Sequence, residues 1–176
     1  AVESLLEGIP AHDAERLVLT ASLSSAYAVT PLAGGITNRN YRLRRREGDV
    51  VVRLSDPESS LLAIDRENEY RNSVAAAESG AAPAVVEYLP GKGVLVVGWV
   101  EGRTYDEQDV CDPANLPRIA AACRILHGGP AFANRFDMFE IQAGYLAHVL
   151  AGGFRLPPRY REFETHVERI RAAFAV

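Results

Sequence analysis

The apolar residues of this chain follow a helical spacing at first and a strand-like spacing from about residue 27. In the opening stretch, leucine and isoleucine stand among charged residues, and Pro10 interrupts the pattern, which predicts two short helices. Between residues 27 and 54, three β-prone stretches are separated by Gly34-Gly35 and by a turn at 47–49. This region predicts three consecutive antiparallel strands.

The remainder of the chain predicts one helix, two further strands and then helices only. A helix is expected over 64–79, because Gly80 suits a helix C-terminus and Pro83 blocks its continuation. The further strands are expected at 84–89 and 94–100, and the later helices at 116–126, 139–150 and 161–174.

This order of elements predicts an α+β fold with a five-stranded antiparallel sheet and one packed helix, followed by an all-helical part. Residues 101–113 combine a glycine, several acids and Pro113, which is typical of a linker. We therefore expect a first domain over 1–100, a linker over 101–113 and a helical domain over 114–176.

Composition narrows the class of protein. The formal net charge of −4 argues against a general nucleic-acid binder. The alternating Arg42, Arg44 and Arg46 are accordingly interpreted as a solvated strand face. Cys111 and Cys123 lack the spacing of a zinc site or a disulfide framework. The chain shows no signal peptide and no apolar run long enough for a membrane span, so we expect a cytoplasmic protein without a membrane partner.

A glycine-rich turn at the first strand connection is a candidate anion site. Gly34 and Gly35 let backbone N–H groups approach an anion, and Thr37 and Asn38 add side-chain donors. The turn is equally consistent with an ordinary hairpin connection, so the motif leaves both interpretations open.

Arg53 interrupts the apolar run at 50–54. A cation buried in a strand needs an acid or a phosphate as partner, whereas an arginine on an edge strand can face water. Glu67 and Glu69 lie at the start of the next predicted helix, where acids also suit the helix dipole. A strand cation held by a helix carboxylate is the arrangement with which kinases bind the α- and β-phosphates of ATP.

Several motifs in order resemble the choline/ethanolamine kinases. They are Gly34-Gly35-Ile36-Thr37-Asn38-Arg39-Asn40-Tyr41, Val51-Val52-Arg53-Leu54, Ile64-Asp65-Arg66-Glu67-Asn68-Glu69, Gly80-Ala81-Ala82-Pro83, Trp99-Val100-Glu101-Gly102, Leu126-His127 and Phe136-Asp137-Met138-Phe139-Glu140. That family is similar to the aminoglycoside phosphotransferases and has a protein-kinase-like fold. The resemblance implies a nucleotide-binding N-lobe followed by the start of a helical C-lobe that ends before the catalytic loop.

The resemblance also implies ligands and residue roles. ATP and Mg²⁺ would be the co-substrates, and a small alcohol such as choline or ethanolamine would be the phosphate acceptor. Arg53 would contact phosphate, with Glu69 as its helix partner and Glu67 as the alternative. The loop from Gly35 to Asn38 would cover the phosphates. Gly98, Trp99 and Val100 would form the hinge, whose backbone bonds adenine.

The catalytic residues of such a kinase are not found in this sequence. His127 and Asn134 have the spacing of a catalytic loop, but Gly129 stands where an aspartate is required, and glycine cannot accept a proton. We therefore expect no turnover by this chain and assign no catalytic or metal-binding residue in it. The alternative is a non-catalytic, pseudokinase-like nucleotide-binding or interaction module.

If the chain acts without a catalytic lobe, apolar residues of its last helices would be exposed and would promote self-association. The residues on which this expectation rests are Leu146, Val149, Leu150 and Phe163.

Overall fold

A computed structural model describes residues 2–34, 38–55 and 65–174. The described residues form two compact units, one up to Ala133 and the other from Asn134 onward. The predicted linker at 101–113 lies inside the first unit, so a domain boundary there stays a prediction. Within the described residues, none of the helices has the length and apolar character needed to cross a bilayer.

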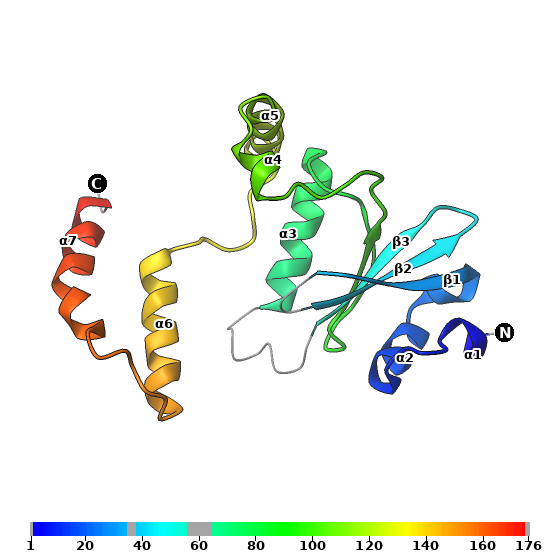
Figure 1. Ribbon diagram of the computed structural model, residues 1–176, viewed down its shortest axis with the longest axis horizontal. Coiled ribbons are helices and arrows are strands. Elements are labelled where there is room, and N and C mark those ends of the chain that lie inside the picture. Colours follow the sequence, from blue (N-terminus) through cyan, green and yellow to red (C-terminus); the bar gives the residue numbers. More distant parts are fainter. Residues whose placement is uncertain (1, 35–37, 56–64, 175–176) are drawn as a thin grey trace. The chain divides into compact units, whose positions relative to one another are not determined.

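The first unit is built on a five-stranded sheet in which every neighbouring pair is antiparallel (Figure 1). The spatial order of the strands is β1-β2-β3-β5-β4. Their bounds are β1 Ala26–Leu32, β2 Asn38–Arg45, β3 Val50–Ser55, β4 Val85–Leu89 and β5 Val94–Gly98. The predicted five-stranded antiparallel sheet and the α+β class are confirmed.

The central strand β3 presents different residues to the two faces of the sheet. Val50, Val52 and Leu54 are at most 1% exposed and lie in the main hydrophobic core. The chain begins with the short helix α1 (Val2–Leu5), followed by helix α2 (Ala11–Val18) and the 3-10 helix η1 (Ala21–Ser25). One leucine of α2 and one of η1 also belong to this core. Because side chains alternate along a strand, Val51 and Arg53 face the opposite side.

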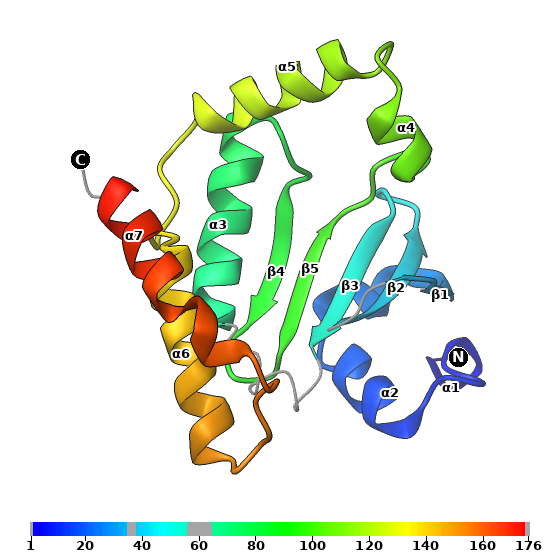
Figure 2. The same ribbon diagram turned by 60° about the vertical axis from the view of Figure 1, so that its left-hand side comes forward.

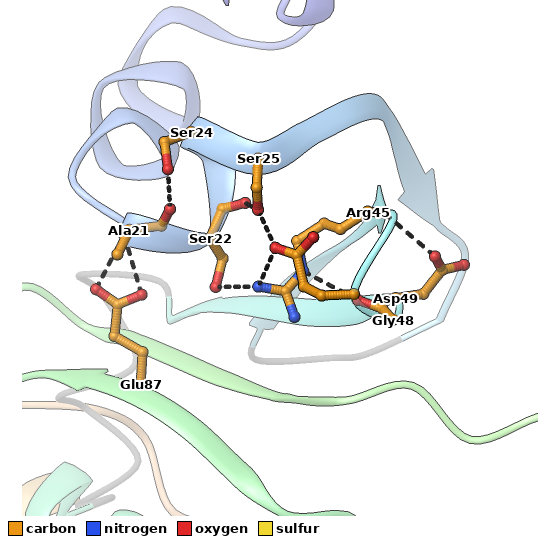
Figure 3. Close-up of polar contacts among 9 residues, drawn as sticks. Ala21, Ser22, Ser24, Ser25, Arg45, Gly48, Asp49 and Glu87 are labelled. Atoms are coloured by element: carbon orange, nitrogen blue, oxygen red, sulfur yellow. Dashed lines mark hydrogen bonds and ion pairs between the residues drawn. The ribbon is translucent and has the colours of Figure 1, made fainter.

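The 3-10 helix η1 is attached to the sheet by polar contacts (Figure 3). The carboxylate of Glu87 on β4 accepts hydrogen bonds from the backbone N–H of Ala21, with both oxygens at 3.1 Å. The side chain of Arg45 reaches Ser22 Oγ at 3.4 Å and Gly48 O at 3.0 Å. These contacts fix the helix that covers one face of the sheet.

Helix α3 (Arg66–Ser79) packs on the other face and runs alongside β4 (Figure 2). Tyr70 of α3 stacks on Tyr88 of β4 with ring centroids 4.3 Å apart. The helix ends at Gly80, whose φ of 83° is the left-handed conformation that favours glycine. The predicted end of this helix is confirmed, whereas residue 64, its predicted start, lies outside the described residues.

The linker prediction missed a short helix. Residues Glu107–Cys111 form α4, whose start is stabilised by a reciprocal capping box between Asp106 and Asp109. The acids that suggested an irregular linker therefore serve as helix caps. Helix α5 (Leu116–His127) follows and contacts α3.

The second unit consists of α6 (Met138–Ala151), the 3-10 helix η3 (Tyr160–Phe163) and α7 (Glu164–Phe174). None of the described residues 134–174 is fully buried. An apolar groove of about 380 Å³ lies between α6 and α7. Leu150 and Phe163 are each 53% exposed. Self-association through these helices stays a prediction.

Candidate functional site

A groove of about 440 Å³ opens on the α3 face of the sheet, where β5 ends. Leu32, Val51 and Val97 supply apolar side chains to it from three different strands. Val51 and Val97 are direct neighbours in the β3–β5 pairing. The remaining wall comes from Pro83 and from residues 98–104. Such a slot between an apolar floor and exposed backbone suits a flat aromatic ligand.

The backbone of the predicted hinge, Gly98 to Val100, is partly used by the fold itself. The N–H of Gly98 donates to Ala84 O at 2.9 Å, and the N–H of Trp99 donates to Asp49 O at 3.1 Å. These two N–H groups are therefore engaged within the protein. The N–H of Val100, by contrast, donates no backbone hydrogen bond among the described residues.

The side chain of Trp99 is held by two charged residues. The guanidinium of Arg42 lies 3.9 Å from the centroid of the indole ring, and the Trp99 Nε1–H donates to Glu101 Oε1 at 2.7 Å. Arg42 is also paired with Asp49, at 2.6 Å between Nη2 and Oδ2, and its hydrogen bond lowers the pKa of Asp49 below the ordinary value. Arg42 is thus a structural cation beside the groove, rather than part of a solvated face as predicted.

Arg53 and Glu69 form an ion pair on the same face as the groove. Arg53 Nη2 lies 2.8 Å from Glu69 Oε1, and the two side chains are 34% and 22% exposed. The second oxygen of Glu69 lies 2.6 Å from Arg66 Nη1. Glu67 pairs instead with Arg71, at 3.0 Å between Glu67 Oε1 and Arg71 Nε. Of the two candidate carboxylates, Glu69 is therefore the partner of Arg53.

Polar residues of β2 and β3 surround this ion pair. Asn38 and Ser55 line a small cavity with Arg53, and Asn40 lies directly opposite Arg53 in the β2–β3 register. The Oδ1 atoms of Asn38 and Asn40 are buried without a hydrogen-bond partner among the described residues. Sequence reasoning singled out Asn38 and missed Asn40. The sequence did contain a signal for Asn40, because residues two positions apart on a strand lie on the same face and Asn40 follows Asn38 by two.

The groove and the ion pair are close neighbours. Val51 and Arg53 are two residues apart on β3, which corresponds to about 7 Å along a strand. An apolar slot with a backbone donor therefore lies beside a cation held by a carboxylate. Gly34, with a φ of 92°, lies four positions before Asn38, the first residue of β2. Gly35 and Thr37, the other predicted residues of the phosphate loop, lie outside the described residues.

Gly129 has a packing role that explains its place in the sequence. A Cβ atom at this position would lie 2.3 Å from the Cβ of Ser79 at the end of α3. The segment is also fixed by Asn72, whose Oδ1 accepts a hydrogen bond from Ala133 N–H at 2.8 Å. The stretch after His127 is therefore a docking contact between α3 and the chain that follows α5.

The described residues do not offer a metal centre. Among them, no three histidine, cysteine or carboxylate side chains gather closely enough to hold an ion. The carboxylate of Glu69 is already shared by two arginines. These donors do not fit a Mg²⁺ ion, which prefers a near-octahedral set of oxygen ligands.

We expect Asp65→Ala to destabilise the protein by about 0.5–2 kcal/mol. Asp65 Oδ1 accepts hydrogen bonds from the N–H groups of Glu67 and Asn68, at 2.9 and 3.1 Å, and so caps the first turn of α3 that carries Glu69. Urea unfolding measures the change. Glu78→Ala, at an exposed position near the other end of α3, is the control and should change stability by less than about 0.5 kcal/mol. Equal effects of both changes would contradict the capping role.

The chain was compared with known protein families and with solved structures. The family described as "Phosphotransferase enzyme family" matches residues 28–175. The chain is similar to a solved choline/ethanolamine kinase family protein from Mesorhizobium loti, with 29% identity and a TM-score of 0.72. The similarity covers 93% of this chain and 53% of that one. No curated protein matches the chain significantly.

A second solved structure, choline kinase LicA from Streptococcus pneumoniae, shares the fold, with 19% identity and a TM-score of 0.68. The similarity covers 90% of this chain and 56% of that one. The chain therefore spans about half the length of these two solved proteins. The resemblance expected from the sequence motifs is confirmed at the level of family and fold.

Proposed function

The chain belongs to the phosphotransferase enzyme family, and we propose that it is the ATP-binding part of a kinase that phosphorylates the hydroxyl group of a small amino alcohol. The observation that carries this proposal is the position of the apolar groove and the Arg53–Glu69 pair on one face of one sheet. An adenine ring and a chain of phosphates need these two environments side by side.

The adenine ring is assigned to the groove. Leu32, Val51 and Val97 would contact the faces of the ring, and the N–H of Val100 would donate a hydrogen bond to a ring nitrogen. A carbonyl oxygen of the hinge would accept from the exocyclic amino group. This combination of apolar contact with a few backbone hydrogen bonds is typical of small-molecule sites.

The phosphates are assigned to the polar end of the same face. The guanidinium of Arg53 would donate charge-assisted hydrogen bonds to a phosphate oxygen, while Glu69 holds the guanidinium in place. Asn38 and Asn40 border this position. The roles of Gly34, Gly35 and Thr37 as the covering loop remain part of this proposal.

We expect this chain alone to bind nucleotide without transferring phosphate. Phosphoryl transfer needs an aspartate beside the acceptor hydroxyl and further groups that hold magnesium. Among the described residues, no three histidine, cysteine or carboxylate side chains gather to hold a metal ion, so none of them is assigned as a Mg²⁺ ligand. We therefore propose the kinase activity for a protein that combines this part with such groups.

Binding of ATP can be followed with the chain's own fluorophore. Trp99 is the single tryptophan and lines the groove. We expect a saturable change of its fluorescence on titration with ATP and a smaller affinity for ribose triphosphate, which lacks the base. Calorimetry on Trp99→Phe separates binding from an optical artefact. Neither heat nor a fluorescence change at millimolar ATP would contradict the proposed site.

The choice of an amino alcohol rests on the similarity to a choline/ethanolamine kinase family protein. A full-length protein containing this part is expected to consume ATP with choline or ethanolamine and not with an aminoglycoside or a sugar. Coupled ADP release measures this preference. If only an aminoglycoside supported turnover, the proposed kinase activity would stand and the proposed amino-alcohol acceptor would be wrong.

A further inference from the structure

Helix α2 carries a fully buried carboxylate that the proposed ATP site does not use. Asp13 is 0% exposed, although aspartate is among the residues that are rarely buried completely. The helix spans Ala11–Val18 and therefore precedes residues 28–175, over which the chain matches its family. The family match thus gives no account of this acid.

Asp13 is the centre of a network of four side chains. Its Oδ2 accepts a hydrogen bond from the Tyr41 hydroxyl at 2.6 Å and lies 2.7 Å from Arg39 Nε. Its Oδ1 accepts from Arg16 Nη2 at 2.9 Å and lies 3.1 Å from His12 Nε2. Both carboxylate oxygens are therefore engaged, by residues from α2 and from β2.

The ionised form of this carboxylate is favoured in the folded protein. Burial by itself raises the pKa of Asp13, but hydrogen bonds from Tyr41 and Arg16 and the charges of Arg39 and His12 outweigh it, so the pKa lies below its ordinary value. A buried ion pair is a poor source of net stability compared with apolar packing, whereas it can fix the relative position of its partners.

The network reaches the ends of both strands that border the proposed phosphate position. Arg39 lies between Asn38 and Asn40 at the start of β2. On the other side, Arg16 Nη1 donates to the backbone O of Ser55, the last residue of β3, at 2.7 Å. One carboxylate on α2 therefore connects the beginning of β2 with the end of β3.

We propose that Asp13 is a positioning residue, which holds the ends of β2 and β3 in the register that presents Asn38 and Arg53 to phosphate. This inference rests on the proposed ATP-binding function. Helix α2 is then part of the site although it touches no ligand. Loss of the carboxylate frees Arg39 and Arg16 to move, and the strand ends lose their common anchor.

The test compares Asp13→Asn with Leu17→Ala in the full 176-residue chain. Leu17 is buried in the same helix and belongs to the hydrophobic core, and its side chain has no polar atom that could bond the network. Hydrogen exchange is measured for residues 38–40 and 53–55 and compared with 43–45 at the far end of β2. ATP affinity is measured by calorimetry.

For Asp13→Asn we expect faster exchange at 38–40 and 53–55 than at 43–45, and an ATP affinity lower by roughly threefold to tenfold. Leu17→Ala should speed exchange at both ends of β2 alike. If the two variants give the same exchange pattern, Asp13 is only structural and the inference is overturned. If the wild type binds no ATP, the proposed function fails, while the exchange pattern still decides on Asp13.

Arg16→Met covers the case in which Asp13→Asn does not fold. This change removes the bond to Ser55 O and leaves Asp13 its contacts with Tyr41 and Arg39. Selective loss of protection at 53–55 is expected, with 43–45 unchanged. Unaltered protection at 53–55 would contradict the connection between α2 and β3.

Discussion

Replacing Arg53 by alanine is expected to weaken ATP binding by about tenfold to a hundredfold while the protein stays folded. A charge-assisted hydrogen bond contributes about 1.5–3 kcal/mol, which corresponds to that loss of affinity. The side chain is one-third exposed, at 34%, so its removal leaves no large cavity. Its partner Glu69 keeps the ion pair with Arg66 and is not left as an isolated charge.

The control for this change is Arg71→Ala. Arg71 lies on the outer surface of α3, is paired with Glu67 and is 60% exposed, so its loss removes the same charge away from the proposed phosphate. Calorimetric titration with ATP should separate the two variants, and thermal unfolding should not. An unchanged ATP affinity of Arg53→Ala would rule out the phosphate contact, and an equal loss in Arg71→Ala would indicate a general charge effect.

Raising the pH from 10 through 12 is expected to remove about 2–3 kcal/mol of stability through Tyr41 alone. Burial and the hydrogen bond to the Asp13 carboxylate raise the pKa of Tyr41 from 10.0 to about 12. A group whose pKa is raised on folding stabilises the protein fully below its unfolded pKa. Tyr41 therefore contributes up to pH 10, and the contribution disappears as the pH passes 12.

Urea unfolding between pH 9 and pH 12 measures this contribution. Tyr41 is 3% exposed, so the ionised phenolate has little access to water in the folded state. The variant Tyr41→Phe cannot ionise and should lose less stability over the same range than the wild type. Tyr27→Phe, at a position that is 60% exposed, is the matched control and should follow the wild type. Parallel pH curves for wild type and Tyr41→Phe would contradict the prediction.

Much of the first unit could be predicted because its signals are local. The apolar run at 50–54, the turn before it and the helix stop at Gly80 lie within a few residues of the elements they define. The capped helix α4 was missed although its capping signal is equally local. Its acids look like a polar linker until the side chains of Asp106 and Asp109 are seen to bond each other's backbone.

The candidate site was predicted less completely than the fold. The sequence named Arg53 and two carboxylates, since a charge in an apolar strand needs a partner. The family resemblance favoured Glu69 over Glu67, and the ion pair that Glu69 forms with Arg53, while Glu67 pairs with Arg71, agrees with that choice. The register of β2 and β3 places Asn40 opposite Arg53. Arg42 contacts the ring of Trp99, which is far from it in the sequence.

The sequence by itself determined the order of strands and helices and the family, because spacing and residue type carry that information. Tertiary structure alone decided which charges meet. The Asp13–Tyr41 hydrogen bond joins residues 28 positions apart, and the Arg16–Ser55 bond spans 39. Such partners depend on how helices pack on the sheet, and the local pattern of residues does not contain that geometry.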